Sequence, residues 1–194
     1  MSEVIELYKK VLDDNEMEMD DIFQEEEIGM GSLYHSATQT HLANLLFNDD
    51  RFVVLVELSL DAGQIDLSPF GLKTKTDMKP DLCVYKRQPE PKLTKPLQPK
   101  RLNTDVLRVT KMPLLAIEVL APSQSVNELL MKFDAYFALG IQSCWLVMPS
   151  LEEVKVYSQQ GTCQTFDTQR DTEVVDEALD IHLPIQKIFE KFEW

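Results

Sequence analysis

The chain has 194 residues, of which 33 are acidic and 19 are basic, so its formal net charge is -14. This length suits a single domain spanning residues 1–194, which can bury roughly 70% of the surface its unfolded chain exposes, and excludes a disulfide-stapled mini-protein. With 44% hydrophobic and 27% charged residues, the composition also excludes wholesale disorder and a fibrous repeat.

The chain carries no sequence signal for export or membrane insertion. Its first 30 residues begin acidic and contain no apolar stretch. The longest uncharged run, residues 135–151, is too short and too polar to cross a bilayer. Cys83, Cys144 and Cys163 are widely spaced and belong to no CxxC or Cys/His cluster, so neither a disulfide framework nor a structural zinc site is predicted. We expect a protein of the reducing cytoplasm with no membrane partner.

Two amphipathic helices are predicted before the first strand. Residues 4–12 carry apolar side chains at helical spacing. Ser32 is suited to cap a second helix, which runs from Tyr34 to Leu46 and stops at Asp49. The apolar stripe of this second helix is expected to face a sheet.

Strands are predicted in the next part of the chain. Residues 52–60 are rich in β-branched and aromatic side chains and end in a turn, with residues 65–70 as the expected hairpin partner. Residues 82–85 form a second short strand. Residues 87–99 hold four of the ten prolines among lysines. They predict a long basic loop, and such loops in compact domains are more often functional than accidental.

The second half of the chain alternates strands with one helix. Residues 114–121 are a nearly continuous apolar run, typical of a strand covered on both faces. Ser125 and Glu128 have the spacing of a capping box, which opens a helix that Gly140 ends. Further strands are predicted at residues 143–148, 154–157 and 161–166. This order predicts an α/β fold around a central mixed sheet.

Charge is distributed unevenly along the chain. The segment from Lys73 to Lys111 holds 11 basic and four acidic residues, a net +7, within a chain of net -14. The segment is either a solvated loop that balances an acidic body or a surface that binds phosphates.

Glu118 is the least expected residue in the sequence. It interrupts the apolar run of a predicted buried strand, where an ionised carboxylate needs a compensating cation or hydrogen-bond donors. It therefore predicts either a structural ion pair or a metal ligand or catalytic acid. Asp81 follows Pro80 at the entry of a neighbouring strand and alone indicates no more than a turn. Together, the two carboxylates are suited to hold a hard cation such as Mg²⁺.

Several short runs, taken in combination, resemble one known family. These are residues 79–82, 116–123, Glu128, Lys132, Tyr136, 140–141 and 145–149. They resemble the Uma-two family of putative restriction endonucleases, long classed as a domain of unknown function, which belongs to the PD-(D/E)XK nuclease superfamily. His35 and the helix after it match the usual histidine and helix of that family.

The resemblance implies a restriction-endonuclease-like core, a central mixed β-sheet flanked by helices. It also implies that Asp81 and Glu118 bind Mg²⁺, with Mn²⁺ as an alternative, and that the reaction is hydrolysis of a DNA phosphodiester. In such a reaction a lysine orients the attacking water and offsets developing charge.

The sequence departs from the superfamily pattern at the lysine. The residue two positions after Glu118 is Leu120. Lys132 matches the lysine seen in this family and is expected to enter the site from the following helix. The alternative is a solvated lysine paired with Glu128, four residues earlier. Tyr136, one turn beyond Lys132, is expected in the core.

A second departure concerns the histidine. Family members often carry an acidic residue shortly before it, where this chain has Gly31 and Ser32. His35 is expected either to contact phosphate or to pack or cap a helix. The spacing of the three histidines, His35, His41 and His182, does not predict a histidine metal site.

Two hypotheses therefore stand beside each other. The first is a Mg²⁺-dependent endonuclease with catalytic Asp81, Glu118 and Lys132, in which the basic segment, including the phosphate-binding candidates Lys73, Lys75 and Lys79, touches DNA. The second is a catalytically inactive accessory or protein-interaction module of the same fold. A small-molecule hydrolase is disfavoured, and no nucleotide cofactor is expected, because the Gly-x-Ser-x-Gly, Walker and dinucleotide motifs are missing. Cutting both strands of DNA favours a homodimer.

Overall fold

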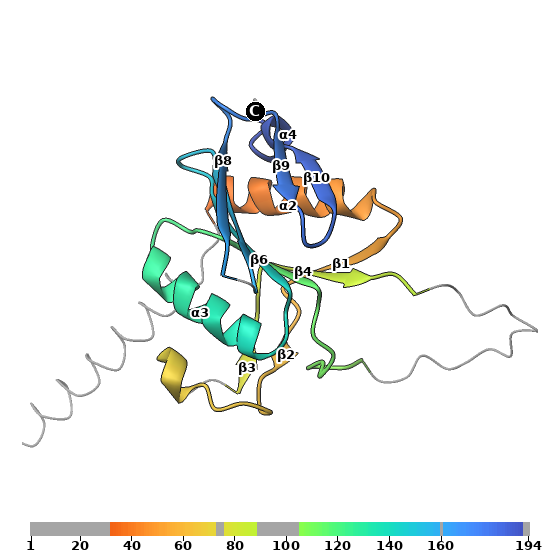
Figure 1. Ribbon diagram of the computed structural model, residues 1–194, viewed down its shortest axis with the longest axis vertical. Coiled ribbons are helices and arrows are strands. Elements are labelled where there is room, and N and C mark those ends of the chain that lie inside the picture. Colours follow the sequence, from red (N-terminus) through yellow and green to blue (C-terminus); the bar gives the residue numbers. More distant parts are fainter. Residues whose placement is uncertain (1–31, 73–75, 89–104, 160, 192–194) are drawn as a thin grey trace, which may run out of the picture.

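The fold is built on a six-stranded mixed sheet with the strand order β1-β4-β5-β6-β7-β8 (Figure 1). The structure is a computed structural model that describes residues 32–72, 76–88, 105–159 and 161–191. The strands are β1 (Phe52–Val56), β4 (Leu82–Lys86), β5 (Leu115–Val119), β6 (Ser143–Met148), β7 (Glu153–Ser158) and β8 (Cys163–Asp167). β5 and β6 are parallel and the other neighbours are antiparallel. The predicted α/β fold with a mixed sheet is confirmed.

The two faces of the sheet are covered by different parts of the chain. Figure 1 shows the helix α2 (Leu33–Phe47) on one face, together with the C-terminal elements β9 (Glu173–Asp176), β10 (Ile181–Pro184) and α4 (Ile185–Ile188). The other face carries the helix α3 (Val126–Ala138), the short pair of β2 (Leu60–Asp61) with β3 (Asp77–Met78), and the 3-10 turn η1 (Ser68–Phe70). The core therefore has two apolar layers, one on each side of the sheet.

The central strands β5 and β6 are buried throughout, because both faces are covered. Leu115, Ile117 and Val119 of β5 pack in the apolar layer between the sheet and α2, whereas Ala116 packs in the layer between the sheet and α3. Since side chains alternate along a strand, Glu118 points to the α3 side. Glu118 of β5 therefore lies in an otherwise apolar layer.

The helix α3 begins and ends as the sequence predicts. The Ser125 hydroxyl accepts a hydrogen bond from the Glu128 backbone, and the Glu128 carboxylate accepts one from the Ser125 backbone. Gly140 follows the helix with a φ of +93°, a conformation that only glycine adopts without strain. The capping box and Gly140 therefore determine where the helix that connects β5 to β6 begins and ends.

Two predictions in the first half of the chain are wrong. The strand predicted over residues 52–60 ends at Val56, because Glu57 takes a φ of +51° and turns the chain. Residues 65–70 form no hairpin strand. There the Asp66 carboxylate accepts a hydrogen bond from the Ser68 backbone, and Pro69 lies in the turn η1. Instead, β2 pairs with β3.

Some elements of the structure were not predicted from the sequence, and some predictions fall on residues that the structure does not describe. The hairpin of β9 and β10 and the short helix α4 are additions to the predicted elements. The predicted helix over residues 4–12 lies outside the described residues, as does most of the predicted basic loop. None of the helices in the described part of the chain is long and apolar enough to span a membrane.

Candidate active site

The register of β4 and β5 places Asp81 beside Glu118. Leu82 pairs with Ile117 in this antiparallel ladder, so the next position along the register joins Asp81 to Glu118. Residues that lie opposite each other in an antiparallel pair point to the same face. The backbone N–H of Val119 donates a hydrogen bond of 2.7 Å to Asp81 Oδ2, which fixes this end of the pair. Asp81 itself lies just before β4, and this hydrogen bond ties its carboxylate to the β5 backbone one residue beyond Glu118.

Glu118 is buried and held by two polar side chains of α3. Its residue is 2% exposed. The Tyr136 hydroxyl donates to Oε1 at 2.6 Å, and Lys132 Nζ lies 3.3 Å from Oε1 and 3.1 Å from Oε2. Burial is the main influence on this carboxyl and raises its pKa, and the neighbouring Asp81 adds to the rise, whereas Lys132 and Tyr136 oppose it. The two donors thus compensate a charge that would otherwise be costly to bury.

Helical spacing explains how α3 supplies both donors. Lys132 and Tyr136 are four residues apart and lie one above the other on the same helix face. Of the two partners considered for Lys132, Glu118 is the one it contacts, while the Glu128 carboxylate accepts a hydrogen bond in the capping box. Leu120, at the position of the superfamily lysine, packs against the apolar layer. The amine therefore enters the site from the helix.

Tyr136 has a role that the sequence did not predict. As expected, it is a core residue, with 0% exposure. Its hydroxyl, however, is bonded to Glu118. The signal that points to this contact is the four-residue spacing from Lys132, which places the hydroxyl on the same helix face as the amine.

Asp81 is held through both its carboxylate and its backbone carbonyl. His35 Nε2, from the first turn of α2, lies 3.3 Å from Asp81 Oδ1. The Asp81 carbonyl accepts hydrogen bonds from Gln39 Nε2 at 3.1 Å and from the Glu57 backbone at 3.0 Å. The hydrogen bond to Asp81 raises the pKa of His35 against the opposing effect of burial. Gln39 and Glu57 are contacts that sequence reasoning missed.

Of the three predicted phosphate-binding lysines, the structure describes Lys79. Lys79 Nζ lies 2.7 Å from Glu57 Oε2, and both side chains are about half exposed, at 52% and 54%. Lys73 and Lys75 lie outside the described residues. Nothing in the sequence marks Glu57 as a partner for Lys79, since it falls within a predicted strand. Its positive φ is what carries it out of the sheet.

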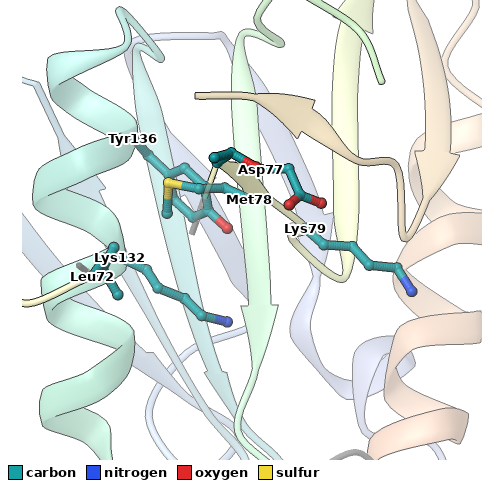
Figure 2. Close-up of a pocket in the computed structure, with 7 residues that line it drawn as sticks. Leu72, Asp77, Met78, Lys79, Lys132 and Tyr136 are labelled. Carbon is teal, nitrogen blue, oxygen red and sulfur yellow. The ribbon is translucent and has the colours of Figure 1, made fainter. Parts of the chain in front are cut away.

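A cavity of about 270 Å³ adjoins the Glu118 cluster. Its lining residues are Leu72, Thr76, Asp77, Met78, Lys79, Lys132 and Tyr136. Figure 2 shows Lys132 and Tyr136 reaching in from α3, with the segment that carries Asp77, Met78 and Lys79 crossing on the other side. Since Lys132 and Tyr136 both bond Glu118, the cavity opens next to the buried carboxylate.

The donor set fits a magnesium ion better than a softer metal. Mg²⁺ prefers oxygen ligands and binds proteins through one or two carboxylates, while keeping waters and taking substrate phosphates. Asp81 and Glu118 supply two such carboxylates. Within the described residues, no group of three or more His, Cys, Asp and Glu side chains gathers as a ready-made metal cage. The fit is therefore to a two-carboxylate site that is completed by water and substrate.

Comparison with models of known families shows which family the chain belongs to. The family model Uma2, described as "Putative restriction endonuclease", matches residues 10–186. The chain belongs to the Uma2 family. The resemblance drawn from the motifs around Asp81 and Glu118 is thereby confirmed, and membership of Uma2 supports a nuclease-like function.

A solved structure supports the fold of this Uma2 member. The chain is similar to the crystal structure of a "putative nuclease belonging to DUF820" from Anabaena variabilis. The two chains are 23% identical, the similarity covers 82% of each, and the TM-score is 0.59. No curated protein matches the sequence. The α/β core of the chain is therefore that of a nuclease-like fold.

Proposed function

We propose that this protein is a divalent-metal-dependent DNA endonuclease in which Asp81 and Glu118 hold Mg²⁺, or Mn²⁺ in its place. One observation carries the proposal: Asp81, at the entry to β4, is bonded to the β5 backbone next to Glu118, and a lysine amine lies 3.1 Å from the Glu118 carboxylate. In a protein of the Uma2 family, this is the combination that metal-assisted hydrolysis of a phosphodiester requires.

The residues of the chain divide the chemical work. A bound divalent cation supplies Lewis-acid polarisation of the phosphodiester and makes water a better nucleophile at neutral pH. The Lys132 ammonium has three N–H donors, and its contacts to the two Glu118 oxygens leave a third to orient the attacking water or offset charge on the phosphate.

The remaining contacts keep the two carboxylates in place. Tyr136 fixes the Glu118 carboxylate through its hydroxyl. The Val119 backbone and His35 hold the Asp81 carboxylate from two directions. A site whose ligands are held by their neighbours needs little rearrangement when the cation and substrate enter.

The DNA itself is proposed to lie along the basic part of the chain. Lys73, Lys75 and Lys79 would contact backbone phosphates, and His35 is a further candidate beside Asp81. Such contacts carry no sequence information but strengthen binding at low salt. A homodimer and a cytoplasmic location belong to the same proposal and rest on the sequence alone.

The inactive accessory module is the second candidate, and one observation favours it. Each of the four carboxylate oxygens has a protein partner: Val119 and His35 for Asp81, and Lys132 and Tyr136 for Glu118. A buried ion pair satisfied in this way is also what a purely structural role would look like. The two candidates differ in whether the pair binds a cation.

Cleavage assays with matched variants separate the two candidates. Purified protein is incubated with supercoiled plasmid and with single-stranded circular DNA in Mg²⁺ or Mn²⁺. The endonuclease hypothesis predicts cleavage that Asp81→Asn and Glu118→Gln abolish and that Asp134→Asn, on the exposed side of α3, leaves unchanged. Equal activity in all variants would remove the site assignment. Absence of cleavage and of metal binding would leave the accessory module.

A further inference from the structure

The cavity beside Glu118 is of a size that holds at most one nucleotide. Its volume is about 270 Å³. Clefts that hold drug-sized ligands measure roughly 300–1,000 Å³, so this cavity lies just below the lower end of that range. A base pair with its two sugars is about twice the size of a nucleotide and does not fit.

The groups proposed for catalysis lie below the surface, and this cavity is lined by Lys132 and by Tyr136, the two partners of Glu118. The side chain of Glu118 is 3% exposed, that of Lys132 19% and that of Asp81 18%. Through the cleft between α3 and residues 76–79, a phosphodiester would reach Lys132 beside the Glu118 carboxylate. In a stiff duplex, extruding a nucleotide costs the free energy of unstacking and unpairing, whereas an unpaired strand avoids this cost.

The walls of the cavity match the two ends of a nucleotide. Lys132 brings positive charge to the side next to Glu118, where a phosphate would lie. Thr76 and Asp77, on the crossing segment, carry oxygens that Arg108 contacts and whose remaining lone pairs are suited to accept hydrogen bonds from the amino groups of bases. Leu72 and Met78 add apolar surface for the face of a base. Figure 2 shows Lys132 on α3 and Asp77 on the crossing segment, which also carries Lys79.

We infer that this cavity binds one unpaired nucleotide of the DNA strand, so that the protein acts on single-stranded DNA, or on junctions with unpaired nucleotides, in preference to intact duplex. The inference rests on the proposed endonuclease function for its catalytic consequence. Its binding consequence can be measured without cleavage, which allows the two to fail separately.

The test is a binding experiment with the intact protein in Ca²⁺. Fluorescence anisotropy measures the affinity for a labelled single-stranded oligonucleotide, for a hairpin duplex of the same sequence, and for that hairpin with one unpaired nucleotide. We expect the single strand and the bulged hairpin to bind about tenfold more tightly than the intact hairpin, as the cost of extrusion predicts.

Pocket-filling variants connect this preference to the cavity. Thr76 is exposed, so Thr76→Trp fills the cavity without disturbing a buried contact. Leu72→Trp fills it from the neighbouring position and serves as a second variant. Both should remove the preference for unpaired DNA, whereas Thr172→Trp, on an exposed residue between β8 and β9, should keep it.

Two results would overturn the inference. One is an intact hairpin that binds as tightly as the single strand. The other is a preference that persists in both filled variants. If the preference holds and depends on the cavity, but neither Mg²⁺ nor Mn²⁺ supports cleavage of any DNA, the binding site stands and the endonuclease proposal fails.

Discussion

Two acids are buried in the part of the chain that the structure describes, and their surroundings differ. Asp176, at the end of β9, is 1% exposed and faces the layer below α2. Its Oδ2 accepts hydrogen bonds from the Ser143 hydroxyl at 2.5 Å and from the Trp145 indole at 2.9 Å, and its Oδ1 accepts from the backbone of residues 178 and 179. Glu118, on the other face, is bonded to a lysine and a tyrosine that line a cavity.

The difference separates a structural acid from a candidate catalytic one. Neutral donors from four residues saturate Asp176 and tie the C-terminal hairpin to the central strands. Glu118 instead has the Lys132 ammonium bonded to it, the Asp81 carboxylate near it and a cavity beside its two partners. Burial of an acid is therefore not a sufficient sign of function. What distinguishes Glu118 is that its partners include groups able to take part in chemistry.

The largest expected effect is on cleavage by Glu118→Gln. The substitution keeps the shape but removes a ligand charge, so we expect the cleavage rate to fall at least about 1,000-fold, equivalent to about 4 kcal/mol of activation free energy. Single-turnover assays on plasmid DNA measure it. Glu128→Gln is the matched control, because glutamine preserves the capping box. A rate within tenfold of the wild type would place Glu118 with Asp176 among the structural acids.

The second effect is on stability and concerns Asp176. Asp176→Ala leaves the Trp145 indole without its acceptor and the Ser143 hydroxyl with only its longer bond to the Tyr157 carbonyl, so we expect a loss of about 3 kcal/mol in the free energy of unfolding. Urea denaturation measures it. Cleavage by the folded fraction should be unchanged. A variant that is fully stable but inactive would reverse the roles assigned to the two acids.

Much of this contrast was visible in the sequence, but not all of it. Glu118 stood out because a single charge interrupts an apolar strand, and the capping residues fixed where α3 begins. Asp176 gave no such signal, since the strands around it are short and partly exposed. Its partners, Ser143 and Trp145, lie more than 30 residues away in the sequence. Contacts of that kind depend on how the C-terminal hairpin folds back, which local pattern does not encode.

The predicted hairpin partner at residues 65–70 failed for a related reason. Apolar residues such as Ile65, Leu67 and Phe70 suggested alternation, but Asp66 and Pro69 impose a turn. Similarly, the sequence left Lys132 with two partners, and only the approach of α3 to β5 decides between Glu118 and Glu128. Helical spacing predicted the faces of the helix, while tertiary packing determined which acid the lysine meets.

A smaller effect is expected for Tyr136→Phe, which sharpens the contrast at Glu118. Phenylalanine keeps the ring in the core but removes the donor to the carboxylate, so we expect cleavage to fall about tenfold, or about 1.4 kcal/mol. Tyr34→Phe, on an exposed tyrosine, is the control. Rates from single-turnover assays that match the wild type would show that the hydroxyl satisfies the buried acid without positioning it.

The smallest effect concerns a third acid, which is exposed. Glu57→Gln breaks the ion pair with Lys79 and frees this amine to contact phosphate. Because exposed ion pairs are worth little, we expect only about a two- to threefold gain in DNA affinity at low salt, fading at high salt. Anisotropy titrations measure it, with Glu177→Gln as an exposed control. An unchanged affinity would remove Lys79 from the DNA-binding surface.

The most direct test is calorimetric titration of the protein with Mn²⁺. If Asp81 and Glu118 jointly hold the cation, the wild type binds one equivalent, and this binding disappears in both Asp81→Asn and Glu118→Gln but persists in Asp134→Asn. Binding that survives in both single variants, or a wild type that binds no cation at all, would contradict the assignment of these two carboxylates as a metal site.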